Sequence, residues 1–199
     1  MKENKTAGAQ GKKALIDLVL SAFFMALGMV LPFLTGQIPA IGNMLLPMHV
    51  PVFLCALICG WQYGTAVGFI LPLLRCAVFG MPIFYPNAIG MAFELAAYAF
   101  VSGFLYGRSR WKCLLSLYRS LVTAMLAGRA VWGVAQVVLL GIKGNRFTLA
   151  AFIAGGFTNA LPGIILQLIL IPAVMLLLRR TGLMKLHRRV RTKGETSHD

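Results

Sequence analysis

Charged residues are scarce in this sequence, and acidic residues are the scarcest. Only 12% of the 199 residues are charged and 5 are Asp or Glu, whereas 59% are apolar. Uninterrupted apolar runs recur along the chain far beyond what the core of a soluble domain needs, which excludes a soluble globular domain. The composition therefore indicates an all-α integral membrane protein that crosses the bilayer several times.

Two further patterns are missing. No small-residue cleavage site follows the basic start MKENKTAGAQGKK, and the apolar stretch behind it continues past Leu31. We interpret this stretch as a first membrane helix and not as a removed signal. The cysteines also lack metal-type or C-x-x-C spacing, so we expect small core-filling thiols and no metal site. They are Cys55, Cys59, Cys76 and Cys113.

Six apolar segments have the length and composition of membrane helices, for which about 20 residues suffice. They are 15–34, 45–60, 62–79, 87–107, 119–141 and 157–178. We therefore expect a bundle of six transmembrane helices over 15–178, between a basic N-terminal tail at 1–14 and a basic C-terminal tail at 179–199.

The basic residues are unevenly distributed among the connections. Fifteen lie in the two tails or around the loop between the fourth and fifth segments, whereas the other connections hold only Lys143 and Arg146. This asymmetry predicts that both termini are cytoplasmic, which requires an even number of spans. The net charge of +14 is thereby explained by membrane topology, without a nucleic-acid partner.

The ionisable side chains within the apolar segments include Arg75, Glu94 and Arg129. A charge at the bilayer centre costs about 2.5–3.5 kcal/mol on insertion scales, so such residues face one another or a wet cavity. We expect all three to converge in the outer half of the bundle as a binding site. The alternative is an Arg–Glu pair that only pins two helices together.

Helical spacing extends this candidate site to other polar residues. Arg129, Trp132 and Gln136 share one face of 119–141; Asn87, Glu94 and Tyr98 share one face of 87–107; and Asn159, Gly163 and Gln167 share a stripe of 157–178. From these stripes Asn87, Tyr98, Trp132, Gln136 and Asn159 join the candidate site. His49 and Tyr85 are added from the neighbouring segments. The alternatives are that His49 satisfies a backbone carbonyl, and that Phe84 and Tyr85 form an aromatic belt at the interface.

The residue types indicate the chemistry of the ligand. Two arginines against one glutamate leave a net positive site, which favours a small anion whose carboxylate one guanidinium binds with two parallel hydrogen bonds. The aromatic residues would supply apolar walls. Elsewhere, Ala22 and Ala26 form a small-xxx-small pattern that lets another helix approach closely, and glycine ladders at 60–68 and 103–107 are expected to pack the bundle itself.

An energy source and a catalytic constellation are also missing. The sequence has no G-x-x-x-x-G-K-[ST] motif, so the chain carries no ATP motor of its own. No internal repeat or mid-membrane helix break supports secondary transport. An intramembrane enzyme that uses Glu94 or His49 remains an alternative, although there is no paired carboxylate and no nucleophile with a base.

Several segments in order resemble the substrate-binding S components of energy-coupling-factor (ECF) vitamin transporters. They are Ala22-xxx-Ala26, LPMHVPVFLCALICGWQYG (46–64), PLLRCAVFGMP (72–82), AIGMAFELAAYAFVSGFLYGR (88–108) and GRAVWG (128–133), and the resemblance covers roughly 15–178. The set Arg75, Glu94 and Arg129 looks closest to the pantothenate-type members.

The resemblance implies a function and partners. The chain would bind a small carboxylate vitamin, pantothenate in the first place, from outside a bacterial plasma membrane. It would dock through Ala22 and Ala26 on a transmembrane coupling subunit, and two cytoplasmic ATPase subunits would consume the ATP. An S component for another water-soluble vitamin or nutrient remains an alternative, as does an assembly subunit.

Overall fold

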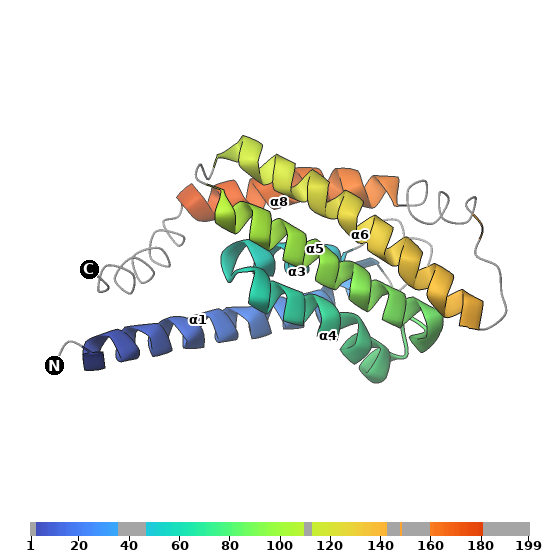
Figure 1. Cartoon of the computed structure of the whole chain (residues 1–199), viewed down its shortest axis with the longest axis horizontal. Coiled ribbons are helices and arrows are strands. Elements are labelled where there is room, and N and C mark those ends of the chain that lie inside the picture. The colour runs from blue at the N-terminus through green and yellow to red at the C-terminus, as the bar shows by residue number, and fades with distance from the viewer. Residues whose placement is uncertain (1–2, 36–46, 110–112, 143–147, 149–159, 181–199) are drawn as a thin grey trace.

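The chain folds into helices joined by turns, without strands, in the part that the computed structural model describes, which is residues 3–35, 47–109, 113–142, 148 and 160–180. The helices, in order, are α1 (Glu3–Val30), the 3₁₀ turn η1 (Leu31–Thr35), α3 (His49–Ile58), α4 (Trp61–Phe79), the π-helical turn η2 (Phe84–Ala88), α5 (Ile89–Arg108), α6 (Leu114–Ile142) and α8 (Leu161–Arg180) (Figure 1). The predicted all-α class is confirmed for these residues.

Five of these helical segments are long and apolar enough to cross a membrane. They are Gly11–Phe33, Trp61–Phe79, Phe84–Arg108, Leu114–Ile142 and Leu161–Arg180. Their outer faces carry large apolar side chains exposed from the bundle, such as Phe23, Val134 and Ile169. Since lipid tails accept such faces and water does not, the chain is a multi-pass membrane protein.

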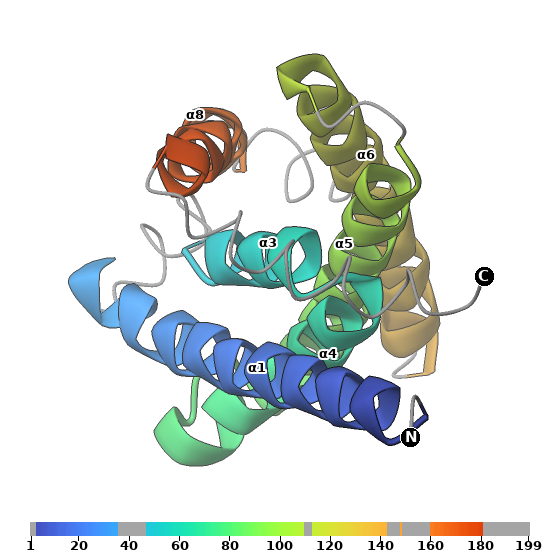
Figure 2. The ribbon, with the colours of Figure 1, turned by 90° about the vertical axis from the view of Figure 1, so that its left-hand side faces the viewer.

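The short helix α3 differs from its prediction. Segment 45–60 was expected to span the bilayer, but the helix has only 10 residues, a rise of about 15 Å, roughly half of the hydrocarbon thickness. Nine of the ten residues are buried. Figure 2 shows α3 in the middle of the bundle, surrounded by α1, α4, α5, α6 and α8. It therefore forms the centre of the core, a position that its apolar composition alone does not reveal.

One end of the bundle is basic. The start of α1 and the end of α8 lie at this end, together with the end of α5 and the start of α6 (Figure 1). Its described basic side chains are Lys12, Lys13, Arg108, Arg119, Arg179 and Arg180. Helix α1 begins at Glu3, so the segment expected as an N-terminal tail continues the first helix; its Lys, Ala and Gln residues favour that conformation.

Small residues bring the helices into close contact. A methyl group added at Gly68 of α4 would lie 2.7 Å from the carbonyl oxygen of Leu95 on α5, and one added at Gly103 of α5 would lie 2.8 Å from Cα of Trp61 on α4. A methyl group at Gly64 would lie 2.5 Å from Cα of Ala56 on α3. Gly64, Gly68 and Gly103 of the predicted ladders therefore pack the bundle and hold α3, α4 and α5 as one unit. Gly60 and Gly107 do not, since nothing lies within 4 Å of a methyl group added there.

Two polar contacts join helices that are distant in the sequence. Arg179 of α8 donates a hydrogen bond from Nη2 to the hydroxyl of Tyr106 on α5, at 2.5 Å. Near the α1–α3 contact, the thiol of Cys55 lies 3.5 Å from the hydroxyl of Ser21, which donates to the backbone oxygen of Asp17. The first contact fixes the register of α8 against α5.

Candidate functional site

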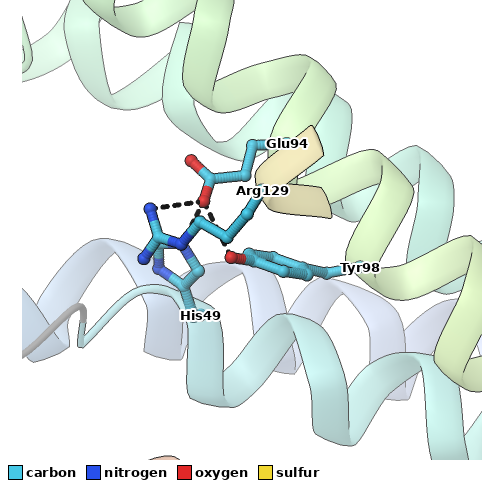
Figure 3. Close-up of polar contacts among 4 residues, drawn as sticks. All are labelled: His49, Glu94, Tyr98 and Arg129. Atoms are coloured by element: carbon cyan, nitrogen blue, oxygen red, sulfur yellow. Dashed lines mark hydrogen bonds and ion pairs between the residues drawn. The ribbon is translucent and has the colours of Figure 1, made fainter. Parts of the chain in front are cut away.

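The seam between α5 and α6 carries a buried ion pair. Gly90, Glu94 and Tyr98 follow one another at four-residue spacing on the face of α5 that meets α6. Oε1 of Glu94 accepts a hydrogen bond from Nη1 of Arg129 at 2.9 Å and another from the hydroxyl of Tyr98 at 2.8 Å (Figure 3). Both bonds end on the same carboxylate oxygen, so one atom orients a cation from α6 and a phenol from α5.

His49 adds a third helix to this group. Its Nε2 lies 3.9 Å from Oε1 of Glu94, too far for a hydrogen bond, and its ring centre lies 5.3 Å from that of Tyr98. His49 is the first residue of α3, and the N-cap residue Met48 makes no side-chain capping bond at this helix start. The positive end of the α3 dipole is therefore buried beside the ion pair, where it favours negative charge. We call His49, Glu94, Tyr98 and Arg129 the polar cluster.

The polar cluster is closed from solvent and still has unused hydrogen-bonding capacity. The exposed fractions of its four residues range from 1% for His49 to 4% for Arg129. Nδ1 and Nε2 of His49 and Nε and Nη2 of Arg129 have no hydrogen-bond partner among the described residues. Leaving such a group buried and unpaired costs about 1–3 kcal/mol, and folded proteins avoid it at sites without a function.

The free atoms of Arg129 form a geometric unit. Glu94 occupies Nη1, whereas Nε and Nη2, which project from one edge of the planar guanidinium, are both unpartnered. This edge is the fork that binds a carboxylate through two parallel N–H···O bonds. Arg129 can therefore bridge Glu94 on one side and a second oxyanion on the other.

Arg75 does not join the polar cluster, contrary to the expectation. Its Nη1 donates to the carbonyl oxygen of Met29 at 2.9 Å, and its guanidinium carbon lies 5.7 Å from the ring centres of both Phe33 and Phe79. The α4–α5 register explains this position: Gly68 meets Leu95, and Arg75 lies seven residues further along α4, about 10 Å away along the helix axis. Arg75 satisfies a carbonyl at the end of α1 and stacks on two aromatic rings.

The charge of the site changes with this placement. Two arginines against one glutamate were expected to leave a net positive site, but in the polar cluster Glu94 faces only Arg129 as a permanent cation. The ion pair is therefore balanced. Any preference for an anion has to come from the free edge of Arg129 and from the start of α3.

Of the other predicted site residues, some lie near the polar cluster and others do not. Gln136 and Trp132 lie against Gly90, one helical turn from Glu94: a methyl group at Gly90 would lie 2.9 Å from Nε2 of Gln136 and 3.7 Å from Cδ1 of Trp132. Tyr85 donates a hydrogen bond to the carbonyl oxygen of Leu139 and so ties η2 to α6. Asn87 has an exposed side chain, as does Phe84, and Asn159 lies outside the described residues.

Gln167 and Asp17 are buried polar residues that were not selected as site residues from the sequence. Gln167 of α8 is 2% exposed, and its Nε2 has no hydrogen-bond partner in the described part of the chain. Its helical spacing with Gly163 was the signal that pointed to it. Asp17 of α1 is 3% exposed. An acid within an apolar segment was the signal for Asp17, and it lies at the α1–α3 contact, apart from the polar cluster.

A separate hollow of about 430 Å³ lies at the basic end, between the end of α5 and the start of α6. Its hydroxyl side chains are already engaged: Ser116 donates to Ser109, and Thr123 donates to the carbonyl oxygen of Arg119. None of the unpartnered buried nitrogens of the described residues belongs to its lining. The unused capacity for a ligand is at the polar cluster and not in this hollow.

The comparison with protein families gives the class of the chain. Residues 17–175 match the family model of the substrate-specific component of ECF transporters, and the chain belongs to this family. It is a transport protein and not an enzyme, it takes a small-molecule substrate, and it works with the other subunits of an ECF transporter. No curated protein and no solved structure matches the chain significantly.

Proposed function

We propose that this chain is the S component for a small carboxylate vitamin, with pantothenate as the favoured substrate. The proposal depends on the Nε and Nη2 edge of Arg129, which has no hydrogen-bond partner among the described residues. This edge is buried, and its two N–H groups have the spacing that binds the two oxygens of a carboxylate. The start of α3 beside it supplies a further positive field. Pantothenate carries a carboxylate, an amide and two hydroxyls, so its oxygens complement a site whose unused atoms are nitrogens.

The proposed orientation and partners follow from the basic end and from the family. In this proposal the basic end faces the cytoplasm and both termini lie there, so the chain passes through a bacterial plasma membrane an even number of times. The short helix α3 belongs to the segment 45–60, which together with the five long helices makes six. The substrate enters from the opposite end. A transmembrane coupling subunit contacts Ala22 and Ala26 on the exposed face of α1, and two ATPase subunits supply the energy.

The rival reading is an assembly subunit in which Glu94 and Arg129 only lock two helices. A locking pair is expected to have its remaining polar atoms satisfied, as buried groups usually are. Here the nitrogens of His49 and two nitrogens of Arg129 are unpaired in the described part of the chain. This observation favours a ligand site.

The test is calorimetric titration of the purified chain in detergent with a panel of vitamins. We expect pantothenate to bind and the cation thiamine not to bind. Arg129→Met should abolish pantothenate binding, whereas Arg119→Met, at an exposed arginine of the same helix, should leave it unchanged. No binding of any carboxylate vitamin, or equal binding by wild type and Arg129→Met, would refute the proposal.

A further inference from the structure

Gln167 is a buried amide whose nitrogen is unpaired among the described residues. It lies on α8, it is 2% exposed, and its Nε2 has no hydrogen-bond partner in the part of the chain that the structure describes. Gly163, Gln167, Ile171 and Met175 are all buried and repeat every four residues, so Gln167 lies on the face of α8 that is turned into the bundle. An amide N–H left unpaired there lowers stability, so it is available to a partner outside the described part of the chain, such as a ligand.

The register of α8 places Gln167 at the depth of the polar cluster. Arg179 of α8 bonds to Tyr106 of α5, and both helices run toward the basic end (Figure 1). Gln167 lies 12 residues before Arg179, since 179 − 167 = 12, and Glu94 lies 12 residues before Tyr106, since 106 − 94 = 12. At about 1.5 Å per residue, both side chains start about 18 Å from this bond along helices that run toward the same end of the bundle.

Two neighbours of α8 each carry one member of the polar cluster. Helix α8 packs on α3, which provides His49, and on α6, which provides Arg129. Five buried side-chain atoms lack a partner among the described residues, and all are nitrogens of His49, Arg129 and Gln167. A neutral histidine has one donor and one acceptor nitrogen, whereas the arginine and glutamine nitrogens only donate. The unused capacity at this depth is therefore mainly for oxygen acceptors.

We propose that Gln167 contacts the substrate: its amide donates a hydrogen bond to an oxygen of the substrate away from the carboxylate that Arg129 binds. This inference rests on the proposed function and narrows the substrate class. The substrate carries, besides its carboxylate, a neutral oxygen acceptor such as an amide carbonyl or a hydroxyl. Arg129 on α6 and Gln167 on α8 then bind different parts of the same substrate molecule.

Two ligands that differ only at the carboxylate separate these roles. Pantothenate and panthenol share the amide and the hydroxyls of the pantoyl part, but panthenol has an alcohol in place of the carboxylate. Calorimetry should show that Gln167→Met weakens the binding of both ligands by the same factor, roughly 5- to 10-fold for one lost hydrogen bond. Panthenol, which binds more weakly, is measured by displacement of a tighter ligand.

Matched variants exclude a structural effect. Ile171→Met changes a fully buried residue one turn further along the same face of α8 and should leave the affinity for both ligands unchanged. Thermal unfolding of ligand-free Gln167→Met should occur at or above the wild-type temperature, because an unpaired buried amide is removed. Gln167→Glu keeps the volume but replaces the donor with an acceptor, and we expect it to weaken pantothenate more than Gln167→Met does.

The possible failures are distinguishable. If wild type binds pantothenate while Gln167→Met and Gln167→Glu both bind it with wild-type affinity, this inference is wrong and the proposed function stands. A weakened affinity that accompanies a lower unfolding temperature of the ligand-free protein would assign Gln167 a packing role and overturn the inference. If wild type binds no pantothenate, the proposed substrate fails and this inference fails with it.

Discussion

At the scale of single residues, the charges of the polar cluster cancel, but some of its hydrogen-bond donors have no acceptor among the described residues. Glu94 neutralises Arg129 through one oxygen and one nitrogen, and the other two guanidinium nitrogens stay unpaired in the described part of the chain. In the membrane interior a lone arginine would be costly, so Glu94 permits a guanidinium to be kept at that depth. The remaining edge is then available for a ligand.

The first prediction concerns the ion pair itself. Glu94→Leu leaves Arg129 as an unpaired buried cation, and we expect the free energy of unfolding to fall by roughly 3–5 kcal/mol. The double variant Glu94→Leu/Arg129→Met removes both charges and should recover most of this loss, but it should not bind pantothenate. Thermal unfolding in detergent and calorimetry measure the two effects.

The double variant decides whether the pair is a unit. If it is no more stable than Glu94→Leu alone, then Arg129 is not the charge that Glu94 balances. Pantothenate binding by the double variant would place the ligand elsewhere.

Helical spacing predicted which residues of one helix face the same side, but it did not predict which helices bring their polar residues together. It put Glu94 and Tyr98 on one face of α5, and Arg129 with Gln136 on one face of α6, because a regular helix fixes which residues share a face. It did not predict the position of Arg75. That position depends on the offset between α4 and α5, which is set by the contact of Gly68 with Leu95 and is not encoded in the pattern of either helix.

At the scale of helices, the close contact of α5 with α6 holds the cluster in place. A methyl group at Gly128 would lie 2.5 Å from Cδ1 and Cε1 of Tyr98, so the tyrosine ring packs directly on the α6 backbone. Phe53 and His49 of α3 enclose the same ring, with ring centres at 5.2 Å and 5.3 Å. Because Gly128 has no side chain, the Tyr98 ring can pack between α6 and α3 while its hydroxyl bonds to Glu94.

The second prediction tests this contact. Gly128→Ala should displace Tyr98 from Glu94, because Phe53 and His49 leave the ring no space to retreat. We expect a loss of stability of about 1–3 kcal/mol from overpacking and a weaker affinity for pantothenate. Gly107→Ala is the control, since nothing lies within 4 Å of the added methyl group. It should leave binding unchanged and stabilise α5 by about 0.5–1 kcal/mol. Equal stability and affinity in both variants would contradict the role of Gly128.

The helices themselves were predictable to different degrees. The long segments α4, α5, α6 and α8 coincide with apolar runs, because the bilayer requires about 20 apolar residues and little else. Helix α3 was overestimated, since a buried helix and a lipid-facing helix have the same hydropathy. Its start at His49 brings a helix terminus into the core, and that arrangement depends on the five helices around it.

At the scale of the whole molecule, the proposed function assigns substrate binding to this chain and energy supply to other subunits. It belongs to the substrate-specific components of ECF transporters, and its sequence has no motif for binding a nucleotide phosphate. The polar cluster lies inside the bundle, whereas Ala22 and Ala26 have exposed side chains on the outer face of α1. In the proposed function, ligand binding and partner docking therefore use different parts of the fold.

The third prediction tests this separation. Ala22→Trp or Ala26→Trp should abolish uptake of pantothenate in cells that contain the coupling and ATPase subunits, because a large side chain prevents close helix approach. The affinity of the purified variants for pantothenate should equal that of wild type. Val134→Trp on the exposed face of α6 is the control and should support normal uptake. Normal uptake by both alanine variants would exclude this face of α1 as the docking surface.

The most direct test of the carboxylate site is the ratio of the affinities for pantothenate and panthenol, measured by calorimetry for wild type and for Arg129→Met. The wild-type chain should prefer the carboxylate by about 100-fold or more, because the buried fork of Arg129 is left unpaired by the alcohol. In Arg129→Met the two affinities should become nearly equal. A carboxylate preference that persists in Arg129→Met, or that is absent from wild type, would contradict the assignment.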